Sequence, residues 1–171
     1  MKYNLDQPIR SEIGMLRYQC TVEWRNGSFI VDEPARAGGQ DKVPDPYSLL
    51  LASVATCTLI TLRMYIDRKG WDIPHVSVAV NMFQVKTEDA VKSVIDRDLR
   101  IDQPLTDEQR LRLTEIATAC PVSRVLEGEI QMRTRTYHQD SSMGHPAYTD
   151  GELIIVGHAE SAKELVDEKT A

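Results

Sequence analysis

The chain has 171 residues, of which 42% are hydrophobic, and this length and composition suit one domain with a substantial buried core. Its formal net charge is −6 and its basic residues are scattered along the chain, which argues against nucleic acid as a partner. Residues 1–8 contain no apolar run of the kind that a secretory signal needs, so we expect a cytoplasmic protein. In a reducing compartment, three cysteines predict reactive or packed thiols rather than a disulfide framework.

The N-terminal part predicts a β-hairpin. Residues 18–24 are rich in strand-forming side chains, and residues 29–31 can return as the second strand. Between these segments, Asn26 and Gly27 form the pair that a type I′ turn prefers, because both central residues of that turn need a positive φ. A glycine-containing polar loop follows the hairpin.

Residues 46–69 predict a long central helix. Asp45 can cap its free amides, Pro46 suits the first helical position, and Gly70 can end the helix in the left-handed conformation. The first two thirds are apolar nearly all round, which is typical of a buried helix. The uncharged stretch of residues 46–62 is short and polar for a bilayer span of about 20 apolar residues, so we expect no membrane partner.

Two strands and a second helix are predicted next. Apolar and polar residues alternate over residues 76–83 and again over residues 95–101, with a charged turn between them. Thr106 and Gln109 form a capping box, so the second helix should begin at Asp107.

The second helix should end before a proline. Pro121 disfavours the helical conformation at Cys120 and is suited to begin a new short helix that runs to Leu126. Residues 130–137 predict a last core strand. We therefore place the domain at residues 1–138 and a C-terminal extension at residues 139–171, with a loop, a candidate strand and a charged tail.

The cysteines are the main candidates for chemistry. Cys57 lies in the third turn of the long helix, where it could equally be a small core side chain, because free cysteine is among the most buried residue types. Cys120 lies at the start of a proline-initiated helix, where free amides favour a thiolate, although packing at a helix end is the alternative. Cys20 lies in a predicted edge-side strand and is interpreted as packing.

Other catalytic patterns are absent from the sequence. There is no Cys-x-x-Cys motif, and the four histidines form no spaced pair, which argues against a structural zinc site. The Gly-x-Ser-x-Gly motif and glycine-rich phosphate-binding loops are also missing. We therefore expect no metal and no bound cofactor.

Three segments of the sequence carry a further signal: Pro46 to Thr58, Arg63 to Trp71, and Ile116 to Leu126. With the order and separation of their two helical cysteines, they together resemble the OsmC/Ohr family of osmotically inducible and organic hydroperoxide resistance proteins. The resemblance covers about residues 16–138 and implies an α+β fold with antiparallel sheets, in which two subunits form an intertwined homodimer around a pair of long central helices.

The resemblance also implies a thiol peroxidase mechanism. The cysteine matching Cys57 attacks an organic hydroperoxide and becomes a sulfenic acid, and the one matching Cys120 condenses with it to an intrachain disulfide. An external dithiol then reduces the disulfide. An arginine of the first hairpin, which Arg25 matches, stabilises the thiolate.

One departure leaves a second function open. Most relatives carry a glutamate nine or ten residues before the first cysteine, where it pairs with the arginine, but this chain has Tyr47 and Ser48 there. The favoured interpretation is a hydroperoxide reductase. The alternative is a non-catalytic member that binds a small apolar ligand at the dimer interface or acts as a redox sensor.

Overall fold

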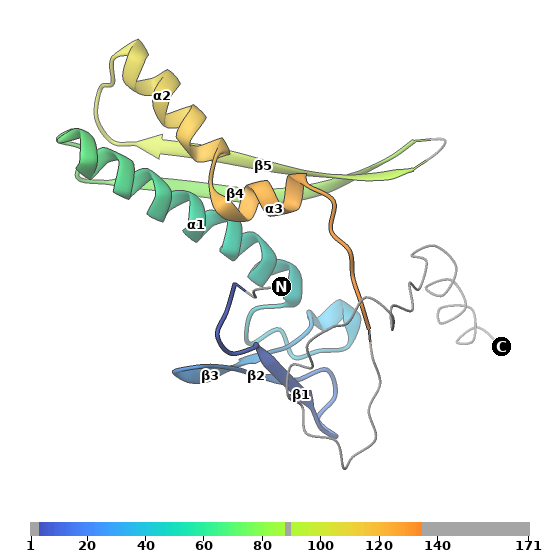
Figure 1. Cartoon of the computed structure of the whole chain (residues 1–171). Helices are drawn as coiled ribbons and strands as arrows, with labels where there is room; N and C mark the ends of the chain where they lie inside the picture. The colour runs from blue at the N-terminus through green and yellow to red at the C-terminus, as the bar shows by residue number, and fades with distance from the viewer. Residues whose placement is uncertain (1–3, 88–89, 135–171) are drawn as a thin grey trace, which may run out of the picture. The chain divides into compact units, whose positions relative to one another are not determined.

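The structure is a computed structural model that describes residues 4–87 and 90–134 (Figure 1). Its first sheet is antiparallel and has the order β1 (Arg10–Ile13), β2 (Cys20–Trp24) and β3 (Gly27–Val31). Strand β2 is therefore the central strand of this sheet, and the prediction of an edge-side position for Cys20 was wrong. The sequence pattern did not predict β1, which pairs with β2 along its whole length and places Ile13 opposite Cys20.

The hairpin between β2 and β3 is present, but its turn differs from the predicted one. Trp24 pairs with Gly27, so the two turn residues are Arg25 and Asn26 rather than Asn26 and Gly27. Neither Asn26 nor Gly27 has a positive φ, so the type I′ prediction was wrong. Gly27 instead makes a close approach possible: a Cβ atom there would lie 3.0 Å from the Trp24 indole ring. The ring packs against this strand, where its centroid lies 5.7 Å from that of Phe29.

A short 3-10 helix, η1 (Ala35–Ala37), precedes the long helix α1 (Pro46–Lys69). The predicted ends of α1 are confirmed. The Asp45 carboxylate accepts a hydrogen bond of 2.8 Å from the Ser48 amide, and this bond holds the pKa of Asp45 below its ordinary value. At the other end Gly70 has a φ of 63°, in the left-handed region.

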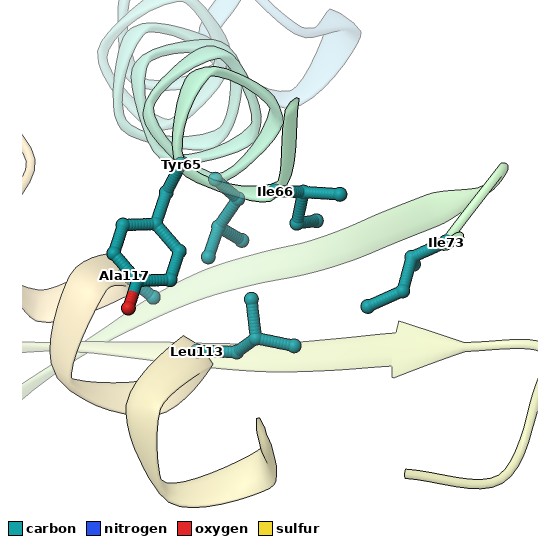
Figure 2. Close-up of a cluster of buried hydrophobic side chains, with 6 residues drawn as sticks. Tyr65, Ile66, Ile73, Leu113 and Ala117 are labelled. Carbon is teal, nitrogen blue, oxygen red and sulfur yellow. The ribbon is translucent and has the colours of Figure 1, made fainter. Parts of the chain in front are cut away.

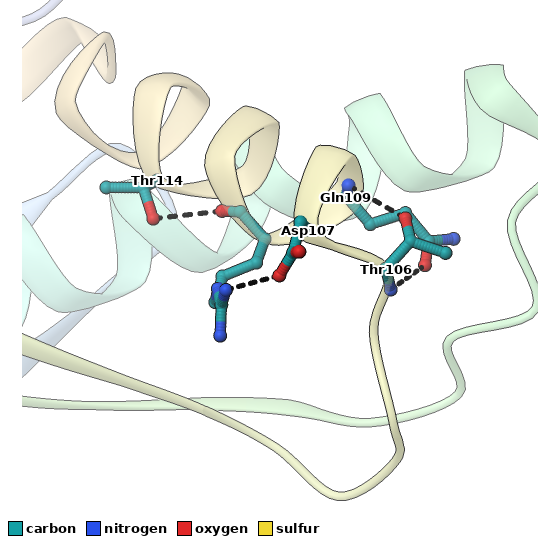
Figure 3. A network of polar contacts seen from close by, with 5 residues as sticks. Thr106, Asp107, Gln109 and Thr114 are labelled. Carbon is teal, nitrogen blue, oxygen red and sulfur yellow. Dashed lines mark hydrogen bonds and ion pairs between the residues drawn. The ribbon is translucent and has the colours of Figure 1, made fainter.

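The predicted strands and C-terminal helices are also present. Strands β4 (Val76–Lys86) and β5 (Val91–Ile101) form a long antiparallel hairpin. Helix α2 (Asp107–Thr118) begins with the capping box, in which Thr106 and Gln109 bond each other's backbone amides (Figure 3). Helix α3 (Pro121–Glu127) follows directly after Cys120, as the proline predicts.

One apolar core joins these elements (Figure 2). Helix α1 packs against β4 and α2, and the buried side chains of this core come from α1, α2 and the segment before β4: Leu62, Tyr65, Ile66, Ile73, Leu113 and Ala117. Full burial of a large apolar side chain contributes about 1.5 to 3 kcal/mol to the stability of the fold. The core thus fixes the C-terminal half of α1 against α2 and positions the α2–α3 junction beside α1.

Helix α1 is less covered than its apolar sequence predicts. Among the described helices α1 alone is long and apolar enough to span a membrane, but core helices of soluble proteins share this property, and 28% of its most apolar 18-residue window is buried. Ile60 and Met64 are exposed on the side opposite Leu62. A single chain therefore leaves one face of its most apolar helix open.

The helices, antiparallel sheets and their order confirm the α+β class. All described helices and strands lie in a compact unit of residues 9–129. Residues 130–134 belong to a second unit and form no strand, so the predicted strand over residues 130–137 was wrong in its described part. No strand of the described chain pairs with these residues, so their backbone N–H and C=O groups form no β-sheet hydrogen bonds within it. The proposed boundary at residue 138 and the C-terminal extension lie outside the described residues.

Candidate active site

The site is built around Cys120, at the junction of α2 and α3. Cys120 adopts extended backbone angles and forms the N-cap of α3, so its Sγ accepts a hydrogen bond of 3.4 Å from the Ser123 amide. Its side chain is fully buried. The break that Pro121 imposes thus places a thiol where a helix presents a free amide.

Two buried hydroxyl groups surround the same sulfur. Ser123 Oγ lies 3.0 Å from Cys120 Sγ, and the Thr58 hydroxyl of α1 donates to it at 3.6 Å. Desolvation by burial raises the pKa of the Cys120 thiol, but hydrogen bonds from Ser123, Thr58 and Cys57 lower it, and the net result is a pKa below the ordinary thiol value of 9.0. The surroundings of Cys120 therefore favour its thiolate.

Cys57 lies next to Cys120. Its side chain lies close enough to Cys120 to lower the pKa of that thiol, and it directly precedes Thr58 on α1. Cys57 is half-buried whereas Cys120 is inaccessible, and both are free thiols. The fold therefore brings together two cysteines that are 63 positions apart in the sequence, with the more accessible thiol on the long helix.

Arg97 of β5 completes the cluster, and the sequence analysis missed it. Its Nη1 donates to Ala117 O at 2.7 Å, to Ser123 Oγ at 2.9 Å and to Thr58 Oγ1 at 3.3 Å, so one of its two N–H groups is shared between two acceptors. A signal was present in the sequence: Arg97 stands in the same alternating register as Ile95 and Leu99, which the pattern places on the buried face. A charged residue on that face needs buried partners, and these are the hydroxyl groups beside Cys120.

A cavity of about 200 Å³ adjoins this cluster. It is lined by one residue of α1, three of β5 and three of α3: Val54, Ser93, Ile95, Arg97, Ser123, Leu126 and Glu127. Mixed apolar and polar walls of this kind suit a small molecule that carries one polar group. Among the described residues, no group of three or more metal-binding side chains is gathered at this or any other place.

The arrangement of a long helix, a β-hairpin and a cysteine at the start of α3 agrees with the sequence comparison. Residues 39–135, more than half of the chain, match the family described as OsmC-like protein. The chain belongs to the OsmC family.

Solved structures of OsmC family proteins have the same fold. The OsmC-like protein of Mycoplasma pneumoniae is 17% identical, with 74% of this chain and 90% of that chain covered and a TM-score of 0.61. The organic hydroperoxide resistance protein OsmC of Legionella pneumophila is 19% identical, with 74% and 93% covered and a TM-score of 0.57. The organic hydroperoxide resistance protein OhrB of Bacillus subtilis is 20% identical, with 71% and 90% covered and a TM-score of 0.54. No curated protein is significantly similar in sequence.

Arg25, the third predicted site residue of this OsmC family member, is not part of the cluster's hydrogen-bond network. It is an exposed turn residue between β2 and β3, and it precedes the residues that match the family. Within the described part of the chain it has no hydrogen bond or ion pair. Ser48, one of the two residues at which the resemblance implies a glutamate, bonds Asp45 through both its amide and its hydroxyl.

Proposed function

We propose that this OsmC family protein is a thiol-dependent reductase of organic hydroperoxides. The observation that supports it most directly is the contact between Cys57 and Cys120, two free thiols of which the buried one is hydrogen-bonded as a thiolate would be. Two structural neighbours are themselves described as organic hydroperoxide resistance proteins, which supports the same substrate class.

The proposed cycle has two oxidative steps. The Cys57 thiolate attacks the outer peroxide oxygen, the O–O bond breaks, and Cys57 becomes a sulfenic acid while the substrate leaves as an alcohol after taking up a proton. The Cys120 thiolate then attacks Cys57 Sγ, hydroxide leaves and takes up a proton from solvent, and an intrachain disulfide forms. In this proposal Arg25 stabilises the Cys57 thiolate.

Reduction requires an external partner. A small or protein-bound dithiol attacks the disulfide, forms a mixed disulfide and closes to its own disulfide, which restores both thiols. All electrons pass through sulfur, so the cycle needs no resident metal or cofactor. The same dependence on free thiols fits a cytoplasmic protein, because that compartment keeps cysteines reduced.

The active unit in this proposal is a homodimer. In a single chain one face of α1 presents Ile60 and Met64 to solvent, although the helix is apolar over most of its length. Burial of this face against the same face of a second chain removes apolar surface from water and is self-complementary about a two-fold axis.

Peroxide consumption by the purified full chain tests the catalytic assignment. With a dithiol reductant and an organic hydroperoxide, wild-type protein should consume peroxide, and Cys57→Ser should reduce the rate to that of the reductant alone. Cys20→Ser is the matched control and should retain wild-type activity, because Cys20 lies in the first sheet.

The products distinguish the reductase from the ligand-binding alternative. After one equivalent of peroxide, peptide mapping should find a Cys57–Cys120 disulfide, for which the two Cα atoms must lie within about 7 Å. Unchanged thiols after peroxide treatment would instead favour a non-catalytic member that binds an apolar ligand, and full activity in Cys57→Ser would refute the assignment of Cys57.

A further inference from the structure

We propose that Arg97 is a positioning residue for the resolving thiol: it orients the hydroxyl groups of Thr58 and Ser123 so that both donate to Cys120. The inference rests on the proposed function in assigning the second oxidative step to Cys120. It assigns a role to a residue of β5 that lies outside both cysteine segments.

The direction of the hydrogen bonds follows from the donor inventory. A guanidinium group has only donors, so the oxygens of Thr58 and Ser123 must accept from Arg97 Nη1. Each hydroxyl group has a single proton, which then points away from the guanidinium. The sulfur of Cys120, at 3.0 Å from Ser123 Oγ and 3.6 Å from Thr58 Oγ1, is positioned to accept both protons.

Arg97 is held in place for this role. Its third bond goes to Ala117 O, in the last turn of α2, where helix carbonyls lack intrahelical partners. Arg97 thereby connects α1, α2 and α3 at the point where they meet the thiol. Within the described residues no carboxylate forms an ion pair with Arg97. The guanidinium group therefore hydrogen-bonds neutral oxygens, and the hydroxyl groups among them in turn hydrogen-bond Cys120.

Charged and titratable groups approach Cys120 from three elements of the described chain. Cys57 faces it from α1 and Arg97 lies behind the hydroxyl groups from β5, while Glu127 of α3 lines the adjoining cavity. Among these, Arg97 is the fixed positive charge, and it favours the thiolate over the thiol.

The consequence falls on one step of the cycle. The attack of Cys120 on the Cys57 sulfenic acid requires the Cys120 thiolate, and the same thiolate is the leaving group when a dithiol attacks Cys57 Sγ during reduction. The first step, oxidation of Cys57 by peroxide, requires no ionisation of Cys120. Arg97 should therefore affect disulfide formation and leave sulfenic acid formation unchanged.

A titration without peroxide tests this inference independently of the proposed function. In a Cys20→Ser/Cys57→Ser background, the ultraviolet absorbance of the thiolate reports the ionisation of Cys120 alone, and the serine introduced on α1 keeps a hydroxyl donor beside it. We expect a pKa below 9.0 in this background. Adding Arg97→Met should raise the pKa by about one unit, and Arg97→Lys should restore part of the decrease because the charge is kept. Arg100→Met, at an exposed position of β5, is the matched control and should have no effect.

Two further variants separate the hydroxyl relay from the structural bond to Ala117. Thr58→Val and Ser123→Ala each remove one hydroxyl group and leave the bond from Arg97 to Ala117 O intact. Each variant should raise the Cys120 pKa. If Arg97→Met does not fold, these two variants test the proposal in its place. An unchanged pKa in folded Arg97→Met, or in both hydroxyl variants, would overturn the proposal.

Single-turnover kinetics in Cys20→Ser protein complete the test. In Arg97→Met, sulfenic acid formation should keep its rate, while disulfide formation at neutral pH should slow about threefold, because a tenfold loss of thiolate is partly offset by its higher nucleophilicity. Equal slowing of both steps would make Arg97 a general structural residue and refute the inference. If peroxide oxidises neither thiol, the proposed function fails, while the titration still decides the role of Arg97.

Discussion

At the scale of single residues, the two cysteines of the site differ in solvent exposure and in hydrogen bonding. Cys57 is half-buried on α1, where a small molecule can approach it, whereas Cys120 is inaccessible and is hydrogen-bonded by an amide and two hydroxyl groups. An accessible thiol such as Cys57 can react with the peroxide, and a buried thiol with a stabilised thiolate, such as Cys120, can attack the sulfenic acid. The order of attack in the proposed cycle follows from this difference.

Arg25 is the residue whose role is least supported by contacts within one chain, and a substitution tests it. Arg25→Met should slow the oxidation of Cys57 by an organic hydroperoxide about threefold or more, because the proposed function assigns the Arg25 guanidinium to stabilising the attacking thiolate. Stopped-flow measurement of the oxidation rate checks this. Arg10→Met, an exposed arginine of the same sheet, is the matched control. Equal rates in wild type and Arg25→Met would leave Arg25 an ordinary turn residue.

Ser48 allows the missing carboxylate to be restored. Ser48→Glu should increase the oxidation rate of Cys57, because a carboxylate at the first turn of α1 can pair with the Arg25 guanidinium and is favoured by the helix dipole. Ser48→Gln has the same length without the charge and serves as the control. A faster rate in both variants would trace the effect to the loss of the Ser48 hydroxyl bond to Asp45, at 3.2 Å, rather than to charge.

At the scale of elements, the N-terminus of α2 depends on a reciprocal pair. The Gln109 amide donates to the Thr106 hydroxyl at 3.1 Å, and the Thr106 amide donates to the Gln109 side chain at 3.0 Å (Figure 3). Without this pair, both backbone amides would have only water as a hydrogen-bond partner at the start of the helix. This cap therefore sets where the helix that leads to Cys120 begins.

Removal of the cap should lower the stability of the protein without changing the cluster around Cys120. Thr106→Ala should lower the free energy of unfolding by about 1 kcal/mol, since the helix loses a side-chain acceptor for its free amide. Denaturant titration followed by circular dichroism measures the change. Thr114→Ala is the control: the Thr114 hydroxyl bonds Arg110 O within the same helix, where alanine is well accommodated, so stability should hold or rise slightly. A loss in Thr114→Ala equal to that in Thr106→Ala would contradict the capping explanation.

At the scale of the whole molecule, the open face of α1 predicts association. We expect sedimentation to give a dimer at micromolar concentration, because Ile60 and Met64 otherwise remain in water at 62% and 69% exposure. Met64→Glu should shift the equilibrium towards monomer, since a carboxylate would be buried without a partner. Leu111→Glu, at a residue of α2 that is 64% exposed, is the control and should remain dimeric. A wild-type protein that sediments as a monomer would refute the prediction.

Local chemistry was sufficient to predict most elements from the sequence. Asp45 with Pro46, Thr106 with Gln109, and Pro121 define helix ends through interactions between residues at most four positions apart, and all three ends are confirmed. The cysteine segments indicated the family in the same way, because their motifs are contiguous. Periodicity likewise predicted both strands of the β4–β5 hairpin.

Tertiary structure decided what depends on pairing between distant residues. The register of β2 with β3 places the turn at Arg25 and Asn26 and puts Gly27 in the strand, beside the Trp24 ring, which the local turn preference did not predict. The role of Arg97 was not visible as a motif, because its partners come from three helices that are remote in sequence: Thr58, Ala117 and Ser123. A sequence pattern reports which face of a strand a residue occupies, but only packing decides which groups lie there to receive its hydrogen bonds.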